Sequence, residues 1–245
     1  MGLTAHPVPG KSKSAALCAA FIEGAPKSAK GHVFYGVKDT NAAAWKKVLA
    51  SGEDYYFIDN SYFDAVRVGG SSTEGGQFRV TRNALQYRDA RKGRSAGKRW
   101  AALGTEIQPW EDRIRGYWLA IEQSDVFMKY SAREPRWYFN TVRNLQATDV
   151  PVKVRPWNPD KTKIQKTLRE DLDGARAVVT HSSAAAITGA IAGVPFIVSP
   201  ESAIHGMQPN ERLHFMQVLA DNQFTVAELR DGTAWAMIHE MERTE

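Results

Sequence analysis

The sequence lacks several features that would assign it to a well-known class of protein. Cys18 is its only cysteine, so no disulfide can form within the chain, as is usual in a reducing compartment. No apolar run reaches the roughly 18 residues that a membrane helix requires. The first residues show no basic stretch followed by an apolar core, so we expect a cytoplasmic protein rather than a secreted one. Cys18 lies in an apolar stretch and is expected to be a buried thiol.

Common catalytic and metal-binding motifs are missing as well. The chain contains no Gly-x-Gly-x-x-Gly, Walker, Gly-x-Ser-x-Gly or His-Glu-x-x-His pattern. With one cysteine and scattered histidines, a structural zinc site is not expected. Residues 171–173 read Asp-Leu-Asp, which imitates a metal-binding motif of some glycosyltransferases. They lie just before a predicted strand, at the wrong end of a parallel sheet for a ligand, so we expect a solvated turn.

Charge is unevenly distributed along the chain. The net charge is +5, whereas residues 79–99 alone hold eight Lys or Arg and one acid, giving +7 and leaving −2 for the rest. A local basic patch is typical of a surface that binds a polyanion such as nucleic acid. A solvated loop or helix face would give the same pattern, and charge alone leaves both interpretations open.

Short β-rich runs alternate with longer helical stretches, which predicts an α/β fold with parallel strands and right-handed crossovers. The strands are expected at residues 32–37, 54–60, 78–85, 116–121, 150–156, 177–180 and 196–199. Residues 211–222 and 226–237 are expected to form closing helices. Residues 106–113 look like a connector. We therefore predict an N-terminal domain of residues 1–110 and a C-terminal domain of residues 111–245.

Polar residues follow four consecutive predicted strands of the second half. Carboxyl ends of parallel strands share one edge of a sheet, where ligands bind. The sharpest segment is 178–186, where a strand runs through His181 into a helix of small side chains, whose N-terminus suits a phosphate. An N-cap serine beside a hydrogen-bonded histidine is the plain alternative. The candidate ligand-binding residues at this edge are Ser124, Lys129, Arg155, His181, Ser182, Ser183, Ser199, Glu201 and Ser202.

Two of these candidates have distinct expected roles. Arg155 ends a predicted strand, where a guanidinium can clamp a diphosphate bidentately. The alternative for Arg155 is a salt bridge to Asp160 or Glu170. Glu201 can accept hydrogen bonds from ribose hydroxyls, although an ordinary turn is the more common explanation for any one such residue taken alone.

In the first half, residues 56–64 form the best candidate for an acceptor site. Asp59, at a strand end, can act as a general base if it is partly desolvated, although a capping role is also consistent. Asn60 neighbours it, and Tyr62 and Phe63 can stack on a base or sugar, or belong to the core.

The second half of the sequence resembles the C-terminal domain of GT-B-type glycosyltransferases. The resemblance is carried by Arg155-Pro156, by residues 172–183 with the run Val178-Val179-Thr180-His181-Ser182-Ser183, and by residues 192–195. The branch in question includes capsular polysaccharide biosynthesis proteins. Residues 57–63, 78–83, 219–225 and 231–235 are similar to bacteriophage-encoded proteins of this branch. The resemblance spans about residues 33–237.

This resemblance implies two Rossmann-like domains facing each other across a cleft, with a reduced N-terminal acceptor domain. It implies a nucleotide-sugar donor, with UDP-sugar favoured, on the C-terminal domain, no required metal or other cofactor, and a location in the cytoplasm of an infected bacterial host. Together with the basic window, it implies double-stranded DNA as acceptor, glycosylated on 5-hydroxymethylcytosine or a related hydroxymethyl pyrimidine. The expected DNA-contacting residues are Arg79, Arg82, Arg88, Arg91, Lys92 and Arg94.

Two alternatives stay open. The first is a glycosyltransferase acting on a surface glycan or small acceptor, and the second is a non-catalytic nucleotide- or DNA-binding module with the same fold.

Overall fold

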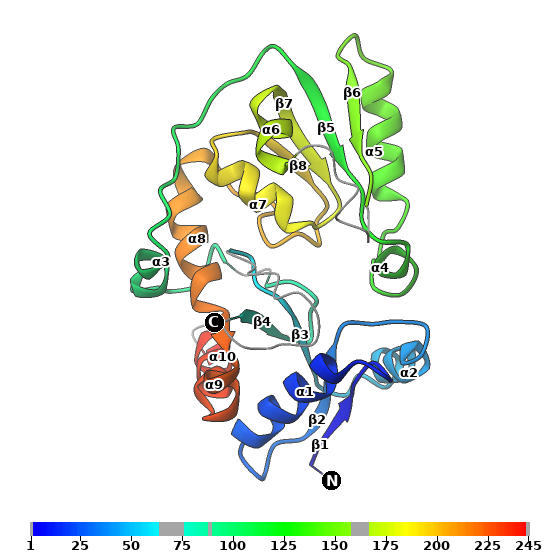
Figure 1. Ribbon diagram of the computed structural model, residues 1–245, viewed down its shortest axis with the longest axis vertical. Helices are drawn as coiled ribbons and strands as arrows, with labels where there is room; N and C mark the ends of the chain where they lie inside the picture. Colours follow the sequence, from blue (N-terminus) through cyan, green and yellow to red (C-terminus); the bar gives the residue numbers. More distant parts are fainter. Residues whose placement is uncertain (1, 64–75, 88–89, 158–166, 244–245) are drawn as a thin grey trace. The chain divides into compact units, whose positions relative to one another are not determined.

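The computed structural model describes residues 2–63, 76–87, 90–157 and 167–243 (Figure 1). The chain divides into two compact units with a sheet each. Unit 1 consists of Met1–Leu103 and Met216–Glu245, and unit 2 consists of Gly104–Phe215. The α/β fold predicted from the alternating pattern is confirmed. No helix among the described residues is long and apolar enough to cross a membrane.

Unit 1 is built on a five-stranded sheet in the order β1-β2-β3-β4-β9. Its strands are β1 (Leu3–His6), β2 (Gly31–Tyr35), β3 (Tyr55–Asn60), β4 (Gln77–Arg82) and β9 (Gln223–Thr225). The first three run parallel, whereas β4 is antiparallel to both of its neighbours. The sheet is therefore mixed, which corrects the expectation of a parallel Rossmann-like N-terminal sheet. Side-chain alternation shows which face a residue occupies but not the direction of its strand.

Helices cover both faces of this sheet. The helices of unit 1 are α1 (Ser12–Gly24), α2 (Ala42–Ser51), α3 (Lys98–Ala102), α9 (Val226–Arg230) and α10 (Thr233–Arg243). Alternate β3 residues point to opposite sides: Tyr56 joins the core with α1, and Phe57 contacts Trp45 of α2 at 5.7 Å between ring centroids. Cys18 of α1 is fully buried, as predicted, and burial raises the pKa of its thiol to about 12.

The C-terminal segment belongs to unit 1, which corrects its assignment to the second domain. Strand β9 pairs with β4, and Phe224 on it is fully buried in the same core as Phe21. Residues 226–237 form two helices rather than one, broken at Gly232, whose φ is +89°. The boundary at the end of the sequence was missed because β9 has only three residues, too few for a periodic pattern.

Unit 2 has a fully parallel sheet in the order β6-β5-β7-β8, as predicted for the second half (Figure 1). Its strands are β5 (Tyr117–Ile121), β6 (Val152–Arg155), β7 (Ala175–Thr180) and β8 (Phe196–Val198). Its helices are α4 (Asp125–Tyr130), α5 (Trp137–Gln146), α6 (Leu168–Asp173) and α7 (Ala184–Ile191). The helix α8 (Arg212–Asp221) contains the point where the chain passes from unit 2 to unit 1.

The predicted connector at residues 106–113 is anchored to the turn between α7 and β8. The N–H of Glu111 donates to the carbonyl of Gly193 at 3.0 Å, and the N–H of Gln108 donates to that of Ile191 at 2.8 Å. Arg212 is buried and donates to the carbonyls of Gln108 and Ala190. This close approach requires glycine at 193, because a Cβ there would lie 2.0 Å from the carbonyl oxygen of Pro109.

We predict that Gly193→Ala destabilises the protein by about 2–4 kcal/mol, because the methyl group clashes with backbone and φ is +77°. Gly10→Ala is the matched control, since Gly10 has φ +72° but nothing within 4 Å of its added Cβ. Its free energy of unfolding should fall by only about 1–2 kcal/mol, the cost of the backbone strain alone. Calorimetric unfolding of both variants measures the difference in stability. Equal losses of stability would show that the backbone at Pro109 moves aside without a measurable energetic cost.

Candidate functional site

In unit 2, the loops that follow β5, β7 and β8 meet at one edge of the sheet. The parallel register pairs Ile121 with Thr180, and Thr180 with Val198, so the residues after each strand are neighbours. The predicted cluster at this edge is therefore assembled from three of the four predicted strand ends. Its members His181, Ser182, Ser199 and Ser202 are all buried.

His181 is the centre of this cluster. Its Nδ1 lies 3.3 Å from the Ser182 hydroxyl and 3.4 Å from the Ser199 hydroxyl. Its Nε2 lies 3.5 Å from a carboxylate oxygen of Glu201, within ion-pair range but without hydrogen-bond geometry. The rings of Phe127 and Trp137 approach His181 edge-on. Because its side chain is fully buried, His181 is placed to position its neighbours rather than to reach into solvent.

Glu201 joins the loop after β8 to the segment between α4 and α5. Its Oε1 accepts hydrogen bonds from the backbone N–H groups of Arg133 at 2.8 Å and Glu134 at 3.1 Å. Burial alone would raise the pKa of Glu201, but the nearby His181 side chain and the hydrogen bonds from these N–H groups outweigh it and lower the pKa. A carboxylate held in this way stays ionised and keeps its second oxygen for other donors.

Gln123 is a site residue that the sequence analysis missed. With its carboxamide oriented to suit the surrounding donors, its oxygen accepts from the N–H groups of Ser183 at 2.6 Å and Ser182 at 3.0 Å. The Ser183 hydroxyl caps α7 by accepting from the N–H of Ala185. The only available signal was positional, because Gln123 and Ser182 each lie two residues beyond the paired Ile121 and Thr180.

Arg155 forms an ion pair with Asp171 of α6. Its guanidinium and the ammonium of Lys153 both bind the carboxylate of Asp171, which is 2% exposed. Burial alone would raise the pKa of Asp171, but the bonds from the two cations outweigh it and lower the pKa. The expected diphosphate clamp at Arg155 is therefore engaged in a structural ion pair. Asp171 is not the solvated turn residue that we expected from its position, because strand β6 supplies two cations on one face.

Ser124 immediately precedes α4, and Lys129 lies in the last turn of this helix. The Ser124 hydroxyl accepts from the N–H of Phe127 at 3.2 Å, so it is the N-cap of this helix. Lys129 is exposed, with its ammonium 4.7 Å from the centre of the Tyr130 ring. The structure gives Ser124 a local capping role and leaves the ammonium of Lys129 at the surface.

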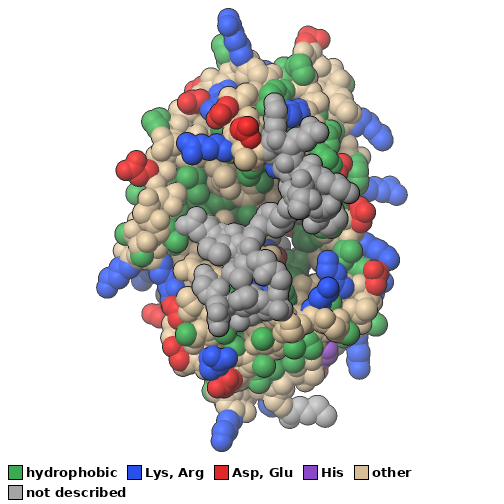
Figure 2. All heavy atoms as spheres, viewed as in Figure 1, with side chains coloured by type: hydrophobic (Ala, Val, Ile, Leu, Met, Phe, Trp, Pro, Cys, Tyr) green, Lys and Arg blue, Asp and Glu red, His purple; other side chains and the backbone are tan. Residues whose placement is uncertain are grey.

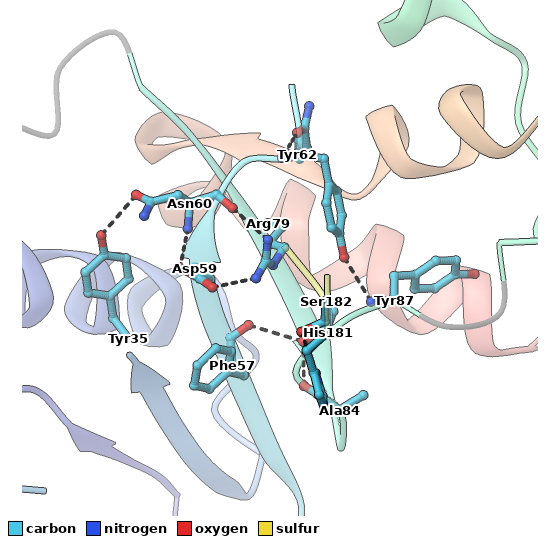
Figure 3. Close-up of polar contacts among 12 residues, drawn as sticks. Tyr35, Phe57, Asp59, Asn60, Tyr62, Arg79, Ala84, Tyr87, His181 and Ser182 are labelled. Carbon is cyan, nitrogen blue, oxygen red and sulfur yellow. Dashed lines mark hydrogen bonds and ion pairs between the residues drawn. The ribbon is translucent and has the colours of Figure 1, made fainter. Parts of the chain in front are cut away.

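In unit 1, Asp59 at the end of β3 is ion-paired with Arg79 of β4 (Figure 3). Oδ2 of Asp59 lies 2.5 Å from a guanidinium nitrogen, and Oδ1 accepts from the N–H of Asn60 at 2.7 Å. Arg79 also donates to the carbonyl of Asn60 and is 6% exposed. Each oxygen of Asp59 thus accepts one hydrogen bond and keeps a second lone pair, which proton abstraction would use.

Two more side chains lie beside this pair and were missed by the sequence analysis. The hydroxyl of Tyr35, at the end of β2, donates to the side-chain oxygen of Asn60 at 3.3 Å (Figure 3). Lys13 of α1 holds its ammonium 4.9 Å from the centre of the Phe78 ring. Burial lowers the pKa of Lys13, while the charge of Asp59 opposes that shift. The cluster thus combines an exposed amide, a carboxylate and two cations.

Tyr62 and Phe63 are interior residues. Both are buried, and their backbone N–H groups donate to the side-chain oxygen of Gln223 on β9. The Tyr62 hydroxyl accepts from the N–H of Tyr87 at 2.9 Å, and its ring faces the guanidinium of Arg79 at 4.8 Å. Stacking on an external base would require these rings to leave the core.

The basic window of residues 79–99 is partly neutralised within unit 1. Three of its cations bind acids outside the window: Arg79 binds Asp59, Arg82 binds Asp54 and Arg99 binds Glu228. Four others, Arg91, Lys92, Arg94 and Lys98, are exposed. Arg88 lies outside the described residues. On the face shown in Figure 2, basic and acidic side chains are interspersed.

Among the described residues, no group of three or more His, Cys, Asp or Glu side chains is placed to hold a metal ion.

Comparisons with solved structures show a likeness in fold. No family model and no curated protein matches the chain. The fold is similar to that of KpsC from Thermosulfurimonas dismutans, described as a beta Kdo 2,4 transferase. The sequences are 14% identical, the match covers 90% of each chain, and the TM-score is 0.48. A likeness at this level concerns the arrangement of the chain and not its chemistry.

We predict that Asp171→Asn destabilises the protein by about 2–4 kcal/mol, because it leaves Lys153 and Arg155 without their shared counter-ion. Asp173→Asn is the matched control, since Asp173 lies on the same helix and is exposed. It should change stability by less than about 0.5 kcal/mol. Urea denaturation compares the two, and a larger loss from the Asp173 variant would contradict the assignment.

Proposed function

We propose that the protein is a glycosyltransferase that moves a sugar from a nucleotide-sugar donor to a hydroxyl of a glycan or another small acceptor. One observation carries the proposal: the loops after β5, β7 and β8 meet around the N-terminus of α7. The N-terminus of a helix at the carboxyl edge of a parallel sheet favours an anionic ligand such as a phosphate. The resemblance of residues 172–183 to GT-B C-terminal domains supports the same use.

The proposed donor site divides into ligand-facing and supporting residues. Gln123 and Ser183 flank the first N–H groups of α7, where we place the donor phosphate. The second carboxylate oxygen of Glu201 is proposed to accept from ribose hydroxyls. His181 and Ser199 are fully buried, so we assign them the role of positioning residues beneath this surface. A UDP-sugar is our first choice of donor.

The proposed acceptor site is the Asp59 cluster of unit 1. Asp59 is the proposed general base, and it would take the hydroxyl proton on a lone pair that Arg79 and the N–H of Asn60 leave unused. Asn60 is exposed and offers an amide to a sugar hydroxyl.

DNA is the second candidate acceptor, in the form of hydroxymethylated pyrimidines. The observation that favours it is the exposure of Arg91, Lys92, Arg94 and Lys98 within eight consecutive positions. Such a cluster can bind phosphates in a salt-dependent way. The pairing of Arg79, Arg82 and Arg99 with internal acids reduces the basic surface that remains, so we rank DNA below a glycan.

Mass spectrometry after incubation with a panel of nucleotide sugars tests the function directly. Oligosaccharides and hydroxymethylated duplex DNA serve as competing acceptors. We expect a mass increase of one sugar on an oligosaccharide. A product on DNA alone, suppressed by added salt, would replace the first candidate with the second, and no product with any donor would overturn the proposal.

Gln123→Glu tests the donor site. The carboxylate can accept from the same two N–H groups, but it places a negative charge where we propose the donor phosphate binds. We expect donor affinity to fall at least about tenfold, or about 1.4 kcal/mol. Gln146→Glu, at the exposed end of α5, adds the same charge elsewhere in unit 2 and should leave affinity unchanged. Calorimetric titration with UDP-sugars gives both affinities. Unchanged affinity in the Gln123 variant would contradict the proposal that the donor phosphate binds at this end of α7.

Asp59→Asn tests the proposed base. We expect transfer to slow at least about a hundredfold, because the amide cannot take the hydroxyl proton, while donor affinity is retained. Asp54→Asn is the matched control, since Asp54 is also paired with an arginine of β4 and lies just before the start of β3. Steady-state transfer rates decide: equal slowing in both variants would mean that losing either ion pair only disturbs the sheet.

A further inference from the structure

Three side chains on the β1 side of the first sheet form a continuous hydrogen-bonded chain. Nε2 of His6 lies 2.8 Å from Nδ1 of His32, and Nε2 of His32 lies 2.9 Å from a carboxylate oxygen of Glu53. His6 is on β1, His32 is on β2, and Glu53 lies between α2 and β3. The two imidazoles therefore connect the edge strand β1 to the interior of the sheet.

This geometry fixes where the protons are. The carboxylate of Glu53 only accepts, so His32 donates from Nε2, and its Nδ1 accepts the proton that His6 carries on Nε2. One additional proton can be accommodated, because His32 can donate from both nitrogens if His6 carries its own proton on Nδ1. A second additional proton cannot, since two N–H groups would then face each other across 2.8 Å. The contact between His6 and His32 breaks when both rings are charged.

The groups around this chain set its acid sensitivity. Burial and then the nearness of His32 lower the pKa of His6 below its ordinary value. Lys30, Glu53 and Asp54 line a cavity of about 440 Å³ next to His32, and Lys47 of α2 acts on Glu53. Asp54 is held by Arg82 and Asn83. The described groups facing the pair are thus two carboxylates, one of them already paired, and two lysines.

Strand β1 is held by several contacts. It is an edge strand of four residues, and none of them is fully buried. Besides its ladder with β2 and the packing of Leu3 on the core, it is held by stacking of His6 on Phe34, with centroids 4.6 Å apart, and by Asn41, which donates to the carbonyl of His6. Loss of the contact between His6 and His32 therefore removes one of the side-chain contacts that hold the strand.

The same strand leads into the proposed acceptor site. Asn41 also donates to the carbonyl of Gly36 and so organises the loop after β2. Beyond β1, the N–H of Val8 donates to the hydroxyl of Ser14, which donates to the carbonyl of Tyr35. Tyr35 in turn bonds Asn60 beside Asp59. A displaced β1 would loosen this series of contacts.

We propose that the His6–His32 pair is an acid-sensitive latch that holds β1 to the sheet, and that its release at low pH loosens the acceptor site. The first part stands on the contacts of β1 alone, and the second part rests on the proposed function. The direction of the pH dependence follows from proton binding. Since the released β1 takes up protons that the latched form excludes, the latch is fully held above about pH 6.5 and weakens as the pH falls below it.

Hydrogen exchange of the full chain, corrected for the intrinsic rate, tests the latch at pH 7.5 and 5.0. We expect the backbone amides of residues 3–6 to lose protection at least about tenfold at pH 5.0. His6→Phe keeps a ring to stack on Phe34 but cannot titrate, so its protection should be the same at both pH values. His205→Gln, on an exposed histidine of unit 2, should behave like the wild type.

His6→Gln serves as a second variant in case His6→Phe does not fold. The protection of residues 3–6 in this variant should also be independent of pH. A wild type without a pH-dependent change, or variants at position 6 that keep it, would overturn the latch. For the second part, the KM for the acceptor found by the transfer screen should rise at pH 5.0 in the wild type but not in His6→Phe. An equal rise in both would overturn that part. Absence of any transfer would count against the proposed function while the exchange result stands.

Discussion

The pairing of β9 with β4 is the contact on which unit 1 depends. Through it, residues 223–225 join a sheet that begins near the start of the sequence, and Phe224, Leu229 and Ile238 fill the core around Phe21. The same strand supplies Gln223, which orders the chain after β3 by accepting from the N–H groups of Tyr62 and Phe63. The ion pair of Asp59 and Arg79 joins β3 to β4, and β4 is the strand that pairs with β9. The proposed acceptor cluster therefore relies on a segment more than a hundred residues away in sequence.

In unit 2 the corresponding constraint is the parallel register of β5, β7 and β8. It brings Gln123, His181 and Glu201 to one edge although they come from three separate loops. Their contacts are mostly with one another and with backbone N–H groups, and burial of His181 and Ser199 leaves only part of the cluster open to a ligand. A site built in this way is rigid before it binds anything, and rigidity lowers the ordering cost of binding.

The sequence predicted the α/β class, the strands of the second half and the convergence of polar residues at their ends, because buried parallel strands followed by polar caps leave a strong local signal. It did not predict β1 or β9, since short strands at or near a chain end carry no periodicity. The ion pair of Arg155 with Asp171 was not predicted, for another reason. Which charge pairs with which is decided by facing strands and helices, and spacing along the chain does not contain that information. Gln123 was missed because its partners are backbone N–H groups, which every residue type offers.

The order of the segments has a consequence for synthesis of the chain. Unit 2 is one uninterrupted stretch, Gly104–Phe215, inserted into unit 1, whose last strand and two helices are made after it. On the ribosome the inserted unit can complete its sheet while the first hundred residues still lack β9 and the helices that cover α1. Those residues keep an exposed apolar face until residues 223–243 have been made, a period in which aggregation or chaperone binding competes with folding.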